Sequence, residues 1–266
     1  MNPKTCSVVL STYNWPEALD LCLASLLKQT RMPDEIIVAD DGSGEATQRV
    51  IEKYKQLSPV PLIHVWQPDE GFKKAAILNK AIARATGEYI VALDGDIIAE
   101  RHFVEDHMNA AGPGHYCFGT RVTIKKSHLP ELFKQRQTSF GLLSRGIKKR
   151  FRGLRLPFML PHLKKYPQIS TKFRGCNCSF WRADFIKING YNEDYVGWGG
   201  EDYELAVRFH KILDYGLRLK HLGIGYHIYH KEASKAHLKQ THEINLESFA
   251  RDSYRTPNGI DKYLNP

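Results

Sequence analysis

The sequence predicts an α/β fold with a mixed, mainly parallel central sheet flanked by helices. Short apolar runs rich in β-branched residues alternate with amphipathic helical stripes through the first hundred residues. This alternation is typical of a parallel sheet that is covered on both faces. Polar residues directly follow three of the apolar runs. No apolar stretch approaches the ~20 residues that are needed to cross a bilayer.

In the first half, we expect strands at residues 6–10, 35–39, 61–66 and 89–93. Helices are expected after a cap at Asn14, where Trp15 and Pro16 begin the helix, and at residues 45–57 and 75–85. Ligands of such sheets collect at the carboxyl ends of the strands. Residues 11–14, 40–43 and 94–96 should therefore meet on one rim.

In the second half, the alternation is less regular. Strands are expected at residues 116–122, 176–181, 218–222 and 226–229, and a helical turn at 183–188. A longer helix should begin at Glu201 and run to about residue 214, and another should lie between residues 234 and 249. With no internal repeat and no low-complexity linker, residues 1–266 are predicted to form one domain.

The positive charge is concentrated in one segment. Residues 121–174 contain fifteen Lys or Arg and one acidic residue, Glu131, and so carry +14, whereas the whole chain carries +9. The rest of the chain is therefore acidic, at −5. Apolar and basic residues interleave in this segment, which we call the basic insert, and Gly153, Pro157 and Pro161 argue against one long helix. Such a segment favours a localised anionic partner.

The strongest candidate for chemistry is the end of the fourth strand. Asp94 and Asp96 are separated by Gly95, and side chains two apart in a strand point to the same face. Carboxylate oxygens suit a hard cation such as Mn²⁺ or Mg²⁺. An ordinary Asp-Gly turn would give the same letters, so the neighbouring residues must decide between the two interpretations.

Other polar residues on the predicted rim could bind a nucleotide. Asp41 could accept hydrogen bonds from a ribose or a uracil-like base, which Ser11 and Tyr13 could flank. Lys73 and Lys74 stand near a helix start, where they could meet phosphate. Taken singly, each residue also suits a turn or a solvated helix end. Together with Asp94 and Asp96 they describe a nucleoside-diphosphate site that needs a metal.

Two later segments carry further candidate residues. In Trp198-Gly199-Gly200-Glu201-Asp202, the glycines clear space, the Trp offers a flat face for a sugar, and a carboxylate could take a proton from a hydroxyl. An acidic helix start is the alternative. His227 and His230 could complete a metal site begun by carboxylates. Residues three apart in a strand face opposite sides, so both can ligate only if the backbone turns between them.

These motifs resemble known glycosyltransferases. Residues 7–14, 38–43 and 93–96 are similar to the inverting glycosyltransferases of family 2, which have the GT-A fold. Residues 188–191 and 197–202 resemble the acceptor-side motif of β-1,4-galactosyltransferases and of bacterial chondroitin-type polymerases. Residues 72–79 are also similar to a galactosyltransferase segment, and this likeness places Asn79 among the substrate-binding residues.

The resemblance implies a role for each matched residue. Ser11, Tyr13 and Asp41 would hold the uridine, Lys74 or Lys73 the diphosphate, and Asp94 the ribose or the metal-linked waters. Asp96 would ligate Mn²⁺ (or Mg²⁺), with His230 and His227 as further ligands. Trp198 would stack on sugar beside Gly199 and Gly200, Glu201 would bind sugar hydroxyls, and Asp202 would be the general base. The donor stays open among UDP-galactose, UDP-N-acetylhexosamines and UDP-glucose.

The resemblance also implies an organisation and partners. Residues 1–105 would form a nucleotide-binding half, 106–230 an acceptor-binding half that contains the basic insert, and 231–266 a C-terminal tail. The acceptor would be a saccharide or a lipid-linked saccharide. We expect a cytoplasmic protein, with residues 121–174 either solvated or in contact with an anionic membrane or acceptor.

Two other functions would explain part of the sequence. A sugar nucleotidyltransferase also uses an α/β sheet and a metal, but a Gly-rich basic loop should then follow the first strand, where Ser11-Thr12-Tyr13-Asn14 stands. A nucleic-acid-binding module would use the basic insert but would leave both carboxylate motifs without a purpose. We therefore expect no nucleic-acid partner.

Overall fold

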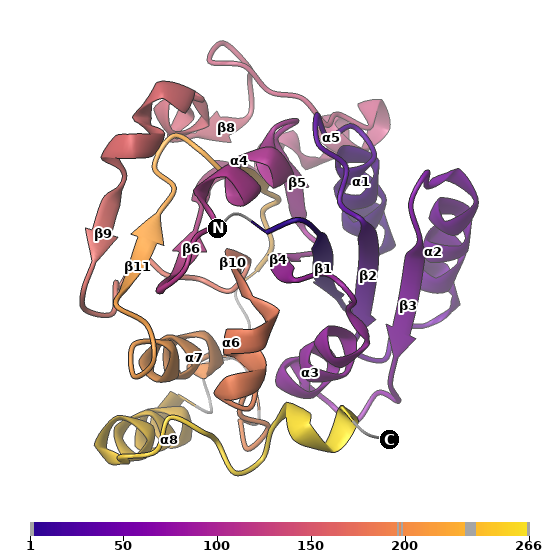
Figure 1. Cartoon of the computed structure of the whole chain (residues 1–266). Helices are drawn as coiled ribbons and strands as arrows, with labels where there is room; N and C mark the ends of the chain where they lie inside the picture. The colour runs from indigo at the N-terminus through magenta and orange to yellow at the C-terminus, as the bar shows by residue number, and fades with distance from the viewer. Residues whose placement is uncertain (1–2, 196, 198, 232–237, 265–266) are drawn as a thin grey trace.

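The computed structural model describes residues 3–195, 197, 199–231 and 238–264. Its centre is an eight-stranded sheet (Figure 1). The strands lie in the order β3 (Leu62–Trp66), β2 (Glu35–Asp40), β1 (Cys6–Thr12), β4 (Tyr89–Asp94), β10 (Asn177–Trp181), β6 (His115–Phe118), β11 (Tyr215–Arg218) and β9 (Lys164–Tyr166). The first four of these strands are parallel, and β10 is antiparallel to both of its neighbours. The predicted mixed, mainly parallel sheet is confirmed.

Helices cover both faces of this sheet. The helices α1 (Pro16–Leu26), α2 (Glu45–Leu57) and α4 (Phe103–Ala110) pack on one face. The other face carries α3 (Lys74–Arg84), α6 (Arg182–Lys187) and α7 (Glu201–Phe209). Strands covered on both sides have no polar face, which explains why β1, β2 and β4 are continuous apolar runs. Their carboxyl ends carry the polar residues of the predicted rim.

A second, four-stranded sheet completes the architecture. Its order is β5 (Ile97–Ala99), β12 (Ile224–His227), β7 (Thr120–Ile124) and β8 (Ile147–Lys148). His227 pairs with Ile97, and the Ile228 amide donates to the Asp96 carbonyl at 3.0 Å. This sheet therefore brings the end of β12 to the residues that follow β4, although about 130 positions separate them in the sequence.

Several predicted boundaries in the second half are wrong. The strand predicted at residues 116–122 is broken at Gly119 into β6 and β7, which belong to different sheets. The helix that begins at Glu201 ends at Phe209 rather than near residue 214, and the last two strands begin two or three residues earlier than predicted. The prediction also missed α4, because its stripe of Phe103, Val104 and Met108 is short.

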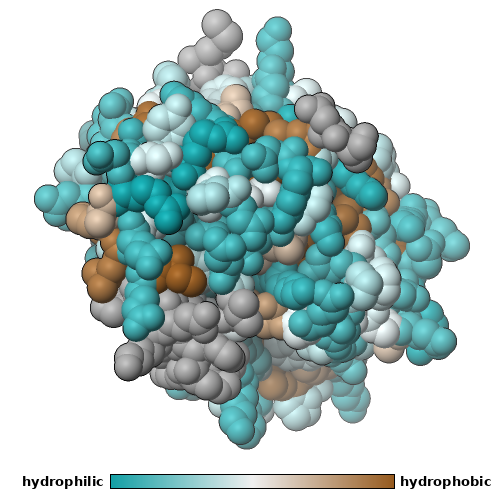
Figure 2. All heavy atoms as spheres, turned by 90° about the horizontal axis from the view of Figure 1, so that it is seen from below, coloured by the Kyte–Doolittle hydropathy of each residue, from teal (hydrophilic) through white to brown (hydrophobic). Residues whose placement is uncertain are grey.

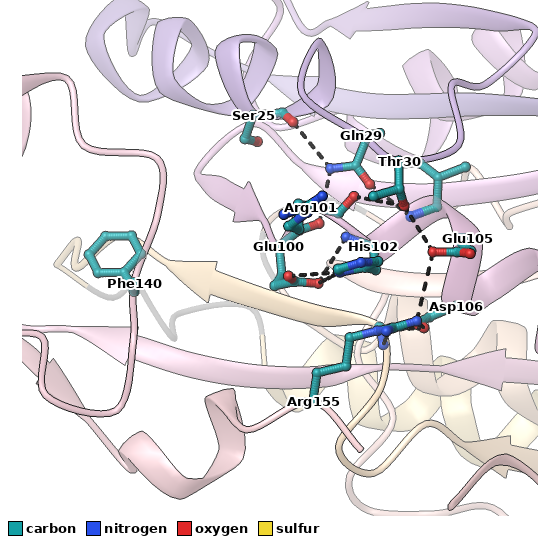
Figure 3. Close-up of polar contacts among 12 residues, drawn as sticks. Ser25, Gln29, Thr30, Glu100, Arg101, His102, Glu105, Asp106, Phe140 and Arg155 are labelled. Carbon is teal, nitrogen blue, oxygen red and sulfur yellow. Dashed lines mark hydrogen bonds and ion pairs between the residues drawn. The ribbon is translucent and has the colours of Figure 1, made fainter. Parts of the chain in front are cut away.

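The basic insert contains several short elements, although most of its residues are exposed to solvent. It contains η1 (Lys126–His128), α5 (Leu129–Gln135), β8, η2 (Arg150–Gly153), η3 (Pro157–His162) and β9, and it crosses the upper edge of the molecule in Figure 1. Figure 3 shows how Arg155 fastens it to α4: the guanidinium donates to Asp106 at 2.7 Å and lies 3.7 Å from Glu105. Asp106 also accepts from the Gly223 amide at 3.0 Å. The expectation of no single long helix is confirmed.

The C-terminal segment packs under α7. It forms α8 (Leu238–Ala250) and η4 (Ile260–Tyr263), and the Ser248 hydroxyl donates to buried Glu204 of α7 at 2.9 Å. Seen from below, the surface is mostly hydrophilic, with hydrophobic residues in small separate patches (Figure 2). Among the described residues, every helix is too short or too polar to cross a membrane. The predicted division of the chain into two halves and a tail stays an interpretation.

Candidate active site

The carboxyl ends of β1, β2 and β4 open into a cavity of about 400 Å³. The predicted rim is therefore hollow, as the rule for ligands of α/β sheets requires. Seven of the predicted site residues line the cavity: Ser11, Tyr13, Asp41, Lys74, Asp94, Asp96 and His230.

Asp41 and Tyr13 are arranged for a planar, polar ligand. Both carboxylate oxygens of buried Asp41 are held in place, one by Gln67 Nε2 at 2.5 Å and one by the Lys73 amide at 2.9 Å. Burial raises the pKa of Asp41. The ring of Tyr13 is 52% exposed, and its hydroxyl donates to Asp69 at 2.9 Å. The aromatic face is thus open to a ligand while the hydroxyl is fixed.

Lys74, rather than Lys73, points into the cavity. The Lys74 ammonium lies 2.6 Å from Asp94 Oδ1, which also accepts from the Ser11 hydroxyl at 2.8 Å. The Lys73 ammonium pairs instead with exposed Glu70 outside the cavity. Although burial opposes a charged lysine, the charges of Asp94, Asp202 and Glu201 raise the pKa of Lys74 well above its usual range. Lys74 therefore stands between the nucleotide side and the later carboxylates.

Asp96, His227 and His230 form a cluster with metal-binding geometry. One ligand atom of each residue lies within 4.8 Å of the others. The Nε2 atoms of His227 and His230 are 3.4 Å and 3.3 Å from Asp96 Oδ2. β12 ends at His227, and residues 228–230 are no longer a strand. The two imidazoles can therefore approach the same carboxylate, as the sequence-based condition required.

The surroundings of the cluster suit a divalent cation. Asp96 Oδ1 is buried without a hydrogen-bonding partner in the described chain. Burial and the charge of Asp94 raise the pKa of Asp96 to about 7, and burial lowers the pKa of His227 to about 4, which keeps that imidazole neutral. An unpartnered carboxylate oxygen beside a neutral imidazole is a ligand set that a cation would complete. The two imidazoles favour a transition-metal cation over Mg²⁺, which prefers oxygen ligands.

Asp94 does not belong to this cluster. Its Oδ1 already accepts from Lys74 and Ser11, and these contacts lower the pKa of Asp94 in spite of its burial. The interpretation in which Asp94 and Asp96 share one cation is therefore not supported by this geometry, whereas the expected role of Asp94 toward the ribose or the metal-linked waters stays a prediction. Both carboxylates lie at or just after the end of β4, but they differ in their partners. Asp94 pairs with the Lys74 ammonium, whereas Asp96 Oδ1 has no hydrogen-bonding partner among the described residues.

Glu201 and Asp202 form the acidic start of α7. Asp202 Oδ2 accepts from the Gly175 amide at 2.8 Å, whereas Asp202 Oδ1 and Glu201 Oε2 are buried without a partner among the residues described. Burial and the charge of Asp202 raise the pKa of Glu201 to about 7, and burial also raises the pKa of Asp202. Carboxylates that have a raised pKa and one oxygen without a hydrogen-bonding partner are suited to accept a proton.

Glycines shape the backbone around these carboxylates. Gly199 and Gly200 have φ of +100° and +101°, the left-handed region that other residues rarely adopt. They set the direction in which α7 begins. A Cβ atom at Gly175 would lie 2.1 Å from Asp202 Oδ1, so only glycine lets β10 approach this carboxylate. Trp198, which was predicted to stack on sugar, lies outside the described residues.

Asn79, like Lys73, is a predicted site residue that does not reach the cavity. It is fully buried on α3, where its amide donates to the Tyr191 carbonyl and to Glu193, both at 2.8 Å, and accepts from the Tyr191 amide. It ties α3 to the turn after α6, and its contact with substrate stays a prediction.

Sequence reasoning missed several residues of the site. Trp15, interpreted only as a helix start, lines the cavity, and its ring meets that of His230 edge-on at 6.2 Å. Phe72 also lines the cavity, and it stands in the segment that carries Lys73 and Lys74. Arg121 begins the basic insert, and its charge acts on both Asp96 and His227. Nothing in its sequence neighbourhood indicates that position.

Comparisons with protein families agree with this geometry. The family model described as Glycosyl transferase family 2 matches residues 7–182. A second model, described as N-terminal domain of galactosyltransferase, matches residues 158–231. The first match covers Asp96 and the lining residues of the cavity up to that position, and the second covers Glu201, Asp202 and both histidines.

Curated relatives are also glycosyltransferases. The chain is 31% identical over 216 residues to a validoxylamine A glucosyltransferase of Streptomyces hygroscopicus subsp. limoneus, a match that covers 77% of this chain and 47% of that protein. It is 27% identical over 241 residues to a chondroitin synthase of Pasteurella multocida, covering 79% of this chain and 24% of that protein. The chain thus spans about half or less of the length of these relatives.

Solved structures share the fold. The N-terminal 349 residues of S. aureus TarS, in complex with UDP-GlcNAc, superpose with a TM-score of 0.64 at 15% identity, covering 92% of this chain and 66% of that one. The same fragment in complex with UDP gives a TM-score of 0.62. At this identity the likeness concerns the fold, which is the GT-A fold expected from the sequence.

Proposed function

The chain belongs to glycosyl transferase family 2, and from that premise we propose that it is a metal-dependent, inverting glycosyltransferase. It moves a hexose or an N-acetylhexosamine from a UDP-sugar to a hydroxyl of a saccharide acceptor. The TarS structures in complex with UDP and UDP-GlcNAc support the choice of donor, and the chondroitin synthase supports an acceptor in surface polysaccharide or lipopolysaccharide assembly. The family match favours this activity over nucleotidyl transfer or nucleic-acid binding.

The observation that carries the proposal is the pairing of two unsatisfied carboxylates around one lysine. Asp96 Oδ1 and Asp202 Oδ1 are both buried and unpartnered within the described residues, and Lys74 feels the charge of Asp202 while it contacts Asp94. Buried polar atoms are almost always satisfied in a finished fold. Two such atoms in one site support one ligand on the donor side and another on the acceptor side.

Asp202 acts as the base. Its Oδ1 takes the proton of the acceptor hydroxyl while the Gly175 amide holds Oδ2 in place. The acceptor oxygen then forms a bond to the anomeric carbon, and the bond from that carbon to the diphosphate oxygen breaks with its electron pair leaving on UDP. Because attack comes from the face opposite to the leaving group, one displacement inverts the anomeric centre. Glu201 orients the acceptor through hydrogen bonds from sugar hydroxyls.

The remaining residues bind and orient the donor. Asp41, Ser11 and the open face of Tyr13 hold the uridine, and Lys74 contacts the diphosphate. A divalent cation held by Asp96, His227 and His230 would supply positive charge for the diphosphate leaving group. Asp94 keeps the Lys74 ammonium in position and lies where ribose hydroxyls can reach it.

The proposal is tested with a panel of UDP-sugars and Mn²⁺. We expect UDP to raise the Tm of the protein only when Mn²⁺ is present, and one UDP-sugar to be hydrolysed slowly without an acceptor. That sugar identifies the donor among UDP-galactose, UDP-glucose and the UDP-N-acetylhexosamines. If UDP gives no Mn²⁺-dependent shift while oligonucleotides bind tightly and salt-sensitively, the assignment fails.

The basic insert supports contact with the cytoplasmic face of an anionic membrane. Leu143, Phe151 and Phe158 are 92%, 73% and 69% exposed, and exposed cations such as Lys149 and Arg150 lie beside them. Exposed apolar side chains among cations are typical of segments that bind membrane interfaces. Co-sedimentation with vesicles should therefore increase with anionic lipid and decrease with salt. Binding that ignores both would contradict the membrane contact without affecting the proposed reaction.

A further inference from the structure

A second cavity, of about 190 Å³, lies next to the proposed acceptor side. It shares no lining residue with the first cavity. Five of its lining residues are cations, contributed by β7, η2, the segment before β10 and the end of β11, and the others are small or neutral. The five are Arg121, Arg152, Lys172, Arg174 and Arg218. We call this cavity the cationic pocket.

The cations of this pocket are not balanced by acidic partners. Within the part of the chain that the structure describes, none of the five forms an ion pair. Arg174 donates only to the carbonyls of Thr171 and Phe173, and Arg121 lies 3.8 Å from the sulfur of Cys176. Arg121, Arg152, Lys172 and Arg174 are exposed, so solvent screens their mutual repulsion. Five like charges around one hollow still create a positive local field, which attracts anions.

Two other cations, both from the basic insert, do form ion pairs with acidic residues. Arg155 donates to Asp106 at 2.7 Å, and Arg136 lies 2.8 Å from Asp20. Those two fasten the insert to α4 and α1. The five cations of the pocket have no such fastening function, and four of them are arginines whose side chains line one hollow. The guanidinium group suits phosphate because it can donate two parallel hydrogen bonds.

The pocket is continuous with the residues that hold the base. Cys176 and Asn177 line it and directly follow Gly175, whose amide binds Asp202. The charge of Arg174 acts on Asp202, and the charge of Arg121 acts on Asp96. A group bound in the pocket therefore lies beside the acceptor rather than beside the uridine, which the first cavity accommodates.

We propose that the cationic pocket binds a phosphate group carried by the acceptor saccharide. This inference deepens the proposed function and rests on its placement of the acceptor next to Asp202. The pocket would orient the acceptor by its phosphate so that a hydroxyl meets Asp202. A lipid surface fits the pocket less well, because the exposed Leu143, Phe151 and Phe158 are not among its lining residues.

Binding of inorganic phosphate to the full chain tests the pocket directly. Calorimetry is performed with Mn²⁺ and UDP at saturation, so that the first cavity is filled. The pocket variant Arg152→Met/Lys172→Met should weaken phosphate binding at least tenfold. The matched control Lys126→Met/Lys134→Met removes two exposed cations of the same insert outside the pocket, and it should change the affinity less than twofold. Equal loss in both variants, or no phosphate binding by the parent, overturns the proposal.

Transfer assays separate this inference from the proposed function. With acceptors offered with and without a phosphate group, the pocket variant should raise KM at least tenfold for the phosphorylated acceptor alone. Its slow UDP-sugar hydrolysis should equal that of the parent, because hydrolysis needs no acceptor. If the parent protein hydrolyses none of the UDP-sugars, the proposed function is refuted instead. Anionic vesicles that bind the pocket variant much more weakly than the control would assign the pocket to lipid and overturn the inference.

Discussion

The carboxylates on the two sides of the site are treated differently by the fold. On the nucleotide side, Asp41 and Asp94 are each held by two groups of the protein. On the other side, Asp96, Glu201 and Asp202 each keep one buried oxygen without a partner among the described residues. The first set is complete as folded and presents a rigid surface to a nucleotide. In the proposed function, a cation and an acceptor would complete the second set, which would then carry the chemistry.

The largest effect should come from removing the base on the incomplete side. Asp202→Asn should lower transfer by about a thousandfold, since a general base contributes on the order of 10²–10⁴. The amide retains the size of the carboxylate, and UDP with Mn²⁺ should still raise the Tm as in the parent. Transfer at the parental rate would show that Asp202 is not the base.

The next comparison exchanges the two aspartates that follow β4. Asp96→Asn should raise the Mn²⁺ concentration needed for UDP-dependent stabilisation by roughly a hundredfold, because an anionic ligand is lost. Asp94→Asn is the matched control: it removes the partner of Lys74 and should weaken UDP binding with a much smaller change in the Mn²⁺ midpoint. Thermal-shift titrations with Mn²⁺ measure both. Similar midpoints in the two variants would remove the distinction between these carboxylates.

The pH dependence of transfer should also come from the incomplete side. Burial raises the pKa of Asp202, and it raises the pKa of neighbouring Glu201 to about 7. A protonated Asp202 cannot accept a proton, so kcat/KM should fall by up to about tenfold per unit as the pH drops through the raised pKa. Profiles recorded at saturating Mn²⁺ should show this acid limb at a higher pH than an ordinary aspartate would give. A flat profile down to pH 5 would contradict the raised pKa.

The smallest effect on the site should come from Asn79. Asn79→Ala leaves the Tyr191 amide and carbonyl without their buried partner, which should lower the free energy of unfolding by about 2 kcal/mol. Affinity for UDP should stay within twofold of the parent. Denaturant unfolding and UDP titration measure the two quantities. A large loss of UDP affinity in a folded variant would restore Asn79 to the nucleotide site.

The nucleotide side could be predicted from the sequence because its information is local. Each buried parallel strand is a continuous apolar run, and the polar residue that follows it is carried to the same rim. Ser11, Asp41 and Asp94 needed nothing more. The sequence could not decide between Lys73 and Lys74, because a shift of one residue in where the helix begins changes which ammonium faces the cavity.

The incomplete side depends on long-range pairing, which no local pattern contains. The approach of His230 to Asp96 requires β12 to pair with β5 and to end at His227. The break at Gly119, which sends β6 and β7 to different sheets, is equally invisible in an apolar run. Arg121 reaches the site only through that break. On this side of the site, the roles of the candidate residues came from the resemblance to known glycosyltransferases rather than from the periodicity of apolar residues.

Gly175 has a consequence for engineering the specificity of this protein. It stands between the cationic pocket and Asp202, and a Cβ atom there would overlap Asp202 Oδ1 at 2.1 Å. A randomised library aimed at new acceptors should therefore keep position 175 constant, while Arg152 and Lys172, which are exposed, can be varied. If Gly175 is kept, acceptor recognition can be redesigned without displacing Asp202, the proposed base.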